Sequence, residues 1–201
     1  MLPGVPIAPD ESALLVPVPA AEAAVGEHRA KLDRSAREGV PAHITVLYPF
    51  LPVGELTDGV LESVRVLMAG IEAFDFTLDR VSWFGSDVVW LGPRDPAPFR
   101  SLTEKAFAAF PACPPYGGQY ADVVPHLTVG DLGGEDVLRL AAAEVSGHLP
   151  IATQATEVIL MTGPRPGSGP DPAARPGRWR TVATFRLGQA GHLQGSADAR
   201  T

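Results

Sequence analysis

The chain has 201 residues, 45% of them hydrophobic and 19% charged, as expected for a globular protein with one sizeable core. Its formal net charge of −7 argues against a protein that coats long RNA or DNA, because such proteins present a basic face to the phosphates. The single cysteine, Cys113, excludes an intramolecular disulfide and a thiolate metal cluster.

The sequence shows no sign of a membrane or secretory segment. No stretch approaches the roughly 20 apolar residues that span a bilayer. The opening residues also lack the basic start and long apolar run of a secretory signal. We therefore expect a cytoplasmic protein with no membrane partner.

Strands and helices are predicted to alternate in the first half of the chain. Short apolar runs at residues 12–19 and 42–50 predict strands, and the Ala-rich segment 20–38 between them predicts a helix that Gly39 ends. Residues 60–71 predict the clearest helix, because apolar side chains recur there at helical spacing.

At the start of the second half, the spacing of hydrophobic residues changes from the helical period of 3.6 to the strand period of two. Residues 74–84 and 88–92 predict a hairpin, and Asp95 is placed to cap the helix that follows. The remaining predicted elements are a strand at 126–132, a helix at 134–148 and strands at 157–163 and 178–187. In the last strand, alternation places Trp179, Ala183, Phe185 and Leu187 on one face.

This order predicts an α+β fold with mainly antiparallel sheets and helices on their outer faces. We expect one domain over residues 1–188, in which the Pro- and Gly-rich segment 163–177 forms a mobile loop. Residues 189–201 are expected to be a disordered tail.

A short internal repeat suggests that the fold has two related lobes. Ala-His-Ile-Thr-Val (42–46) resembles Pro-His-Leu-Thr-Val (125–129), and each lies on a predicted strand that is followed by a helix. The natural interpretation is a bilobal, pseudo-symmetric molecule whose sheets face a central cleft.

Each repeat places an imidazole beside a hydroxyl. Residues i and i+2 of a strand share a face, so His43 and Thr45 point together, as do His126 and Thr128. With an ordinary pKa of about 6.5, one histidine can be neutral and the other protonated near pH 7. The pair is suited to acid–base cleavage of a phosphodiester, and the threonines to donating hydrogen bonds to phosphate oxygens.

Two other interpretations compete with this one. Histidine is a common metal ligand, but neither motif has a second histidine, a Glu or a cysteine pair beside it, so no metal site and no cofactor are predicted. The alternative from another class is an RNA- or nucleotide-binding module that keeps the cleft without turnover.

The two tetrads, His43-Ile44-Thr45-Val46 and His126-Leu127-Thr128-Val129, resemble the paired motifs of the 2H phosphoesterase superfamily, the 2′-5′ RNA ligase-like proteins. The resemblance in overall pattern covers roughly residues 12–187. It implies a bilobal fold with His43 and His126 as the acid–base pair and Thr45 and Thr128 as phosphate contacts. It also implies hydrolysis of 2′,3′-cyclic phosphates or related diesters, and reversible 2′-5′ ligation.

The substrate is expected to be small, a nucleotide or an RNA end, bound by a monomer. Tyr48, Tyr116 and Tyr120 flank the two motifs and are candidates for stacking a base, although for any one of them packing at the rim is the favoured interpretation. Five arginines lie between residues 163 and 186; Arg178 and Arg180 among them are candidates for holding phosphates, with a solvated strand face as the equal alternative.

Overall fold

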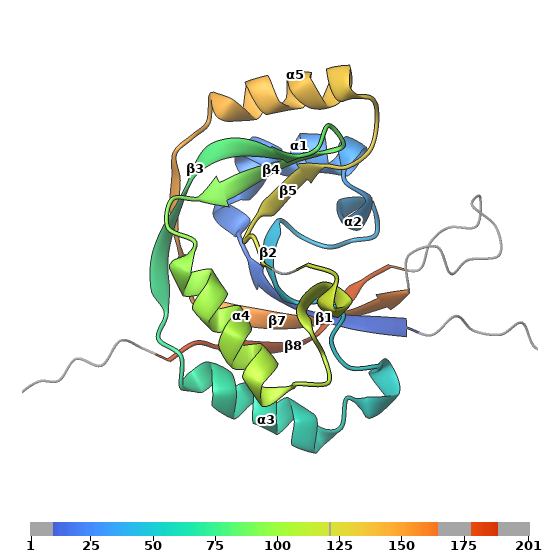
Figure 1. Cartoon of the computed structure of the whole chain (residues 1–201), viewed down its shortest axis with the longest axis vertical. Coiled ribbons are helices and arrows are strands. Elements are labelled where there is room, and N and C mark those ends of the chain that lie inside the picture. The colour runs from blue at the N-terminus through green and yellow to red at the C-terminus, as the bar shows by residue number, and fades with distance from the viewer. Residues whose placement is uncertain (1–9, 121, 165–177, 189–201) are drawn as a thin grey trace, which may run out of the picture.

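The computed structural model describes residues 10–120, 122–164 and 178–188 (Figure 1). The described strands are β1 (Asp10–Pro17), β2 (His43–Leu47), β3 (Phe74–Phe84), β4 (Val88–Pro93), β5 (Leu127–Gly130), β6 (Ile151–Ala155), β7 (Glu157–Pro164) and β8 (Arg180–Arg186). The α-helices are α1 (Glu22–Leu32), α2 (Arg34–Arg37), α3 (Asp58–Ala69), α4 (Ala97–Ala109) and α5 (Glu135–Ser146). The structure also has three short 3-10 helices among the described residues: η1 (Pro19–Ala21), η2 (Val53–Glu55) and η3 (Pro115–Gly118).

The strands form two four-stranded sheets, ordered β2-β1-β7-β8 and β5-β4-β3-β6. Every pairing between neighbouring strands is antiparallel, which confirms the predicted fold class. Strand β2 begins at His43 and strand β5 begins one residue after His126; the two strands occupy equivalent edges of their sheets and contact each other. The fold thus brings the two repeats together from distant parts of the sequence.

Helices cover the outer faces of both sheets. Helices α1 and α5 pack on the sheet that contains β5, and α3 and α4 pack on the sheet that contains β2. Figure 1 shows α5 along one end of the molecule and α3 along the other, with the sheets between them. Since α1 precedes β2 in the chain but packs on β5, the covering helices tie the two sheets together.

The β2-β1-β7-β8 sheet is covered by apolar side chains on both faces. Its central strands β1 and β7 are therefore nearly continuous hydrophobic runs. Leu14 and Val16 face the main core, whereas Ala13 and Leu15 belong to a smaller cluster on the opposite face. The full set of buried residues in this smaller cluster is Ala13, Leu15, Val40, Ile159, Met161 and Trp179, with Tyr48 packed against it. We call it the floor cluster, because it forms part of the cavity described below.

The structure departs from the predicted elements in three places. Strand β6, which pairs with β3, was not predicted. The predicted helix 20–38 is broken at Asp33, whose extended backbone and side chain cap α2. In β8 the register shifts opposite Leu160 and Met161, so that Trp179 packs in the floor cluster while Phe185 packs in the main core. The predicted common face of Trp179 and Phe185 is therefore wrong.

The predicted mobile loop and tail fall mostly outside the described residues. Gly163 and Pro164 end β7, but residues 165–177 and 189–201 are not among those described. Among the helices of the described ranges, none is both long and apolar enough to cross a membrane.

Candidate active site

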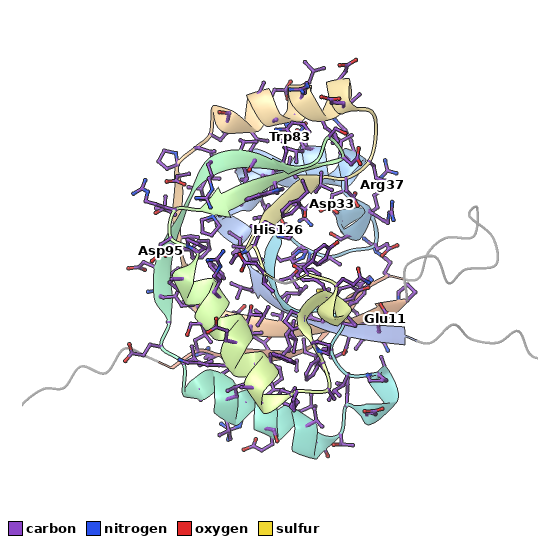
Figure 2. All side chains as sticks on the ribbon, in the orientation of Figure 1. Glu11, Asp33, Arg37, Trp83, Asp95 and His126 are labelled. Atoms are coloured by element: carbon purple, nitrogen blue, oxygen red, sulfur yellow. The ribbon has the colours of Figure 1, made fainter. Side chains whose placement is uncertain are left out.

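A cavity of about 610 Å³ lies where β2 and β5 meet, and the histidine and threonine of each tetrad line it. The strand alternation places the four polar residues as predicted: His43, Thr45, His126 and Thr128 are partly exposed in the cavity wall. The intervening Ile44 and Leu127 are fully buried in the core on the other side, and Val46 and Val129 likewise. In Figure 2, His126 lies in the interior between the two sheets, and Asp33 lies at the start of α2.

Both imidazoles are held in the same way. Nδ1 of His43 lies 2.8 Å from the carbonyl oxygen of Pro41, and Nδ1 of His126 lies 2.7 Å from that of Val124. A carbonyl oxygen only accepts hydrogen bonds, so each ring must carry a proton on Nδ1. Nε2 is then the nitrogen of each ring that remains to exchange protons with a ligand.

The surroundings keep both rings neutral at pH 7. Burial lowers the pKa of His43 to about 4, and the positive charge of Arg29 acts in the same direction. Burial also lowers the pKa of His126, against the hydrogen bond to Val124. Because a nearby anion favours the charged imidazolium, a bound phosphodiester would raise both pKa values.

Aromatic side chains form much of the remaining wall. Tyr48, Tyr116 and Tyr120, the three predicted candidates, all line the cavity. The rings of Tyr116 and Tyr120 meet edge to face at 5.8 Å. Burial raises the pKa of Tyr116, while a hydrogen bond with Thr45 opposes the change, so the phenol is neutral and touches the first tetrad.

The backbone of Tyr116 is held in an unusual conformation. Its φ of 51° lies in the left-handed region, where non-glycine residues are uncommon. Its N–H donates to the carbonyl of Tyr48 at 2.6 Å, which fastens η3 to the end of β2. This strained turn brings the phenol to Thr45, in keeping with the tendency of strain to concentrate at functional sites.

Trp179 is a cavity residue that the sequence pattern did not reveal. The register shift in β8 turns it onto the cavity side, where its ring meets Tyr48 edge to face at 6.2 Å. Burial raises the pKa of Glu38, although the indole of Trp179 donates a hydrogen bond to this carboxylate. A bulge can seldom be predicted from a sequence, so strict alternation assigned Trp179 to the wrong face.

Charged residues in the cavity wall are mostly acidic. Four carboxylates, Asp33, Glu38, Asp122 and Asp131, line it, and Arg34 is the basic side chain among the described lining residues. The predicted phosphate-binding residues Arg178 and Arg180 are exposed and are not among the residues that line the cavity. Their role in substrate binding stays a prediction.

The described residues offer little to hold a metal ion. No group of three or more His, Cys, Asp or Glu side chains within residues 10–120, 122–164 and 178–188 has a metal-binding arrangement. The residues that line the cavity include two imidazoles, two hydroxyls and an aromatic wall, a set suited to proton transfer around an anion.

Comparison with known proteins agrees with this arrangement. The model of the 2′-5′ RNA ligase superfamily matches residues 16–165, and the chain belongs to that family. Among curated protein sequences, no significant match was found.

Solved structures share the fold at low sequence identity. E. coli LigT complexed with 3′-AMP is 21% identical, with a TM-score of 0.52 over 90% of this chain and 99% of LigT. A structure described as a phosphoesterase is 21% identical with a TM-score of 0.54, over the same shares of the two chains. The protein TT0787 of Thermus thermophilus is 17% identical with a TM-score of 0.53, over 90% of this chain and all of that one.

Proposed function

We propose that this protein is a phosphodiesterase that needs no metal ion and hydrolyses 2′,3′-cyclic phosphates at RNA ends or related 2′-linked nucleotide diesters. The observation that carries the proposal is the pair of imidazoles in one cavity, each with Nδ1 held by a backbone carbonyl. One ring takes a proton from water and the other delivers one to the departing oxygen, steps that each contribute about 10²–10⁴-fold to rate. The threonine hydroxyls donate to the phosphate oxygens.

A compact substrate fits this cavity better than a long nucleic acid. Its volume of about 610 Å³ is within the range of small-molecule sites. The acidic wall repels further phosphates, whereas the aromatic side chains offer stacking surfaces worth about 1–3 kcal/mol for each base. Fold similarity to LigT, whose structure was solved with 3′-AMP, supports a ligand of nucleotide size.

The test offers 2′,3′-cyclic nucleotides and oligonucleotides with cyclic ends to the wild type in the presence of EDTA. We expect hydrolysis that EDTA does not inhibit, and a loss of about 10²–10⁴-fold in kcat in His43→Asn and in His126→Asn. Asparagine retains a donor for the backbone carbonyl, so these variants should fold. Since both histidine pKa values are lowered, kcat/KM should peak below pH 6.5.

Three results would contradict the proposal in different ways. Inhibition by EDTA that added metal reverses would indicate a metallohydrolase. Tight binding of all these nucleotides without turnover would indicate a binding module. Full activity in both asparagine variants would dismiss the acid–base pair. Incubating the products with the enzyme tests for the reverse reaction, 2′-5′ ligation.

A further inference from the structure

Each histidine of the cavity depends on one backbone carbonyl, whose own direction must be fixed. The carbonyl of Pro41 accepts from Nδ1 of His43, and the carbonyl of Val124 accepts from Nδ1 of His126. Both carbonyls lie just before β2 and β5, outside the described strands. If either carbonyl turned away, its histidine would lose the acceptor that keeps the proton on Nδ1.

The peptide unit that holds His43 is fixed by Glu22, the first residue of α1. The carbonyl of Pro41 and the N–H of Ala42 belong to the same planar peptide unit. Oε1 of Glu22 accepts from this N–H at 2.7 Å. Because a peptide unit turns as one rigid body, the carboxylate of Glu22 fixes the direction of the Pro41 carbonyl and, through it, the ring of His43.

The peptide unit that holds His126 cannot be fixed in the same way, because its second residue is Pro125, which has no N–H. Instead, Nε of Arg100 in α4 donates to the carbonyl of Val123 at 3.3 Å. The proline ring fixes its own φ and restricts the residue before it. With the Val123 carbonyl held on one side and the proline ring on the other, the Val124 carbonyl keeps little freedom to turn.

An arginine contacts the equivalent position in the other half of the molecule. Nη2 of Arg29 in α1 donates at 3.3 Å to the carbonyl of Val40, three residues before His43, just as Val123 lies three residues before His126. Helix α1 packs on β5 and helix α4 packs on β2. Each helix therefore covers one sheet while its arginine holds the segment that leads into the histidine of the other.

Each of these arginines is paired with an aspartate of the cavity wall. Arg29 lies 2.8 Å from Asp33, and Arg100 lies 3.1 Å from Asp122. The first pair is buried, whereas the side chains of Arg100 and Asp122 are 43% and 72% exposed. Replacing Arg100 therefore leaves no buried charge unpaired, so its contact can be tested in the folded protein.

We propose that Glu22 and Arg100 are positioning residues that keep the proton of each catalytic imidazole on Nδ1 and leave Nε2 to exchange protons with a ligand. Neither is among the residues that line the cavity, so each acts through the backbone that holds its histidine. The inference rests on the proposed function, since it concerns the same pair of histidines, but its structural part can be measured without a substrate.

The tautomers of the two rings can be read from ¹⁵N NMR spectra of protein labelled at histidine, with His43→Asn and His126→Asn identifying the signals. In the wild type near pH 7, both rings should carry the proton on Nδ1. In Arg100→Met, His126 should populate the tautomer with the proton on Nε2 while His43 stays unchanged. In Glu22→Ala, His43 should change and His126 should not.

Conservative variants separate positioning from a general loss of structure. Arg100→Lys retains a charged donor, and Glu22→Gln retains an acceptor for the N–H of Ala42, so both should keep the wild-type tautomers. Arg65→Met is the matched control for Arg100→Met, because Arg65 is an exposed helical arginine that pairs with Glu62 of its own helix. This control should alter neither ring.

In an assay with a 2′,3′-cyclic nucleotide, the loss should fall on kcat, since the imidazoles act in the chemical step while the cavity wall binds the substrate. We expect Arg100→Met and Glu22→Ala each to lower kcat by about 10–100-fold and to change KM by less than about 3-fold, because a misplaced catalytic group can cost about 10²-fold. Arg100→Lys and Glu22→Gln should stay within about 3-fold of the wild type in kcat.

The inference requires the change of tautomer and the loss of kcat to occur together. Either change without the other in Arg100→Met or Glu22→Ala would overturn it, as would an equal loss in Arg100→Lys and Arg100→Met. If the tautomers change as expected but the wild type cleaves no diester, the positioning stands and the proposed function fails. If the wild type hydrolyses cyclic nucleotides and these variants match it, the proposed function stands and this inference fails.

Discussion

His43 and His126 share one local arrangement, in which Nδ1 donates to the carbonyl two residues earlier in the chain. Strand alternation was enough to predict that each histidine and its threonine point together, because that depends only on residues i and i+2. The carbonyl contacts and the charge of Arg29 were not predictable, since they depend on how the preceding loop folds and on a helix from elsewhere in the chain.

The contact between the phenol of Tyr116 and Thr45 can be tested by a single substitution. Tyr116→Phe keeps the ring but removes one neutral hydrogen bond, so we expect kcat/KM on a cyclic nucleotide to fall about 2–10-fold. Tyr120→Phe is the matched control, since Tyr120 is 64% exposed and meets Tyr116 through its ring. Equal losses in both variants would show that the contact with Thr45 contributes nothing.

The helices and strands with strong hydrophobic periodicity could be predicted from the sequence. Elements that depend on a neighbouring strand or on a side-chain contact could not. Helix α3 was clear from its apolar stripe. Strand β6 has the sequence IATQA, with little apolar alternation, and exists because β3 offers it an edge to pair with. The break at Asp33 interrupts a segment of helical composition. The Asp33 side chain accepts from the backbone N–H of Ser35 and so caps α2, while it also pairs with Arg29.

Gly163 tests how closely β7 and β8 approach around Trp179. A Cβ atom at this position would lie 2.4 Å from the indole of Trp179. Gly163→Ala should therefore displace the ring from the floor cluster and destabilise the protein by roughly 1–3 kcal/mol, measured by urea unfolding, with a shift in tryptophan fluorescence. Gly54→Ala is the control, because no atom lies within 4 Å of its added methyl.

A double variant checks the cause of this loss. In Gly163→Ala/Trp179→Ala the ring atoms that the methyl would meet are removed, so the two changes should cost less together than the sum of each alone. If the losses in the free energy of unfolding simply add, the alanine at position 163 does not destabilise the protein through Trp179.

In the whole molecule, the two histidines link stability to pH. Their pKa values are lowered on folding, so between pH 6.5 and about 4 the unfolded chain binds protons that the folded protein does not, and stability falls as pH falls. Full enclosure of His43 would make its share roughly 3 kcal/mol; since the ring is partly open to the cavity, we expect about 1–3 kcal/mol.

The measurement compares the free energy of unfolding of the wild type and His43→Asn at pH 7 and pH 4. The wild type should lose stability relative to the variant by that amount, because the carboxylates titrate alike in both. A difference that stays constant between the two pH values would contradict the lowered pKa of His43.

The sheet that carries His43 is built from both ends of the described chain, with β1 paired to β7 and β7 to β8. During synthesis, β1 and β2 leave the ribosome long before the strand on which β1 depends has been made. The sheet that carries His126 has all its strands by residue 155. The cavity, whose wall includes Trp179 just before β8, is thus complete only when translation has passed residue 186, and a chain that stops before β7 lacks the strand that pairs with β1.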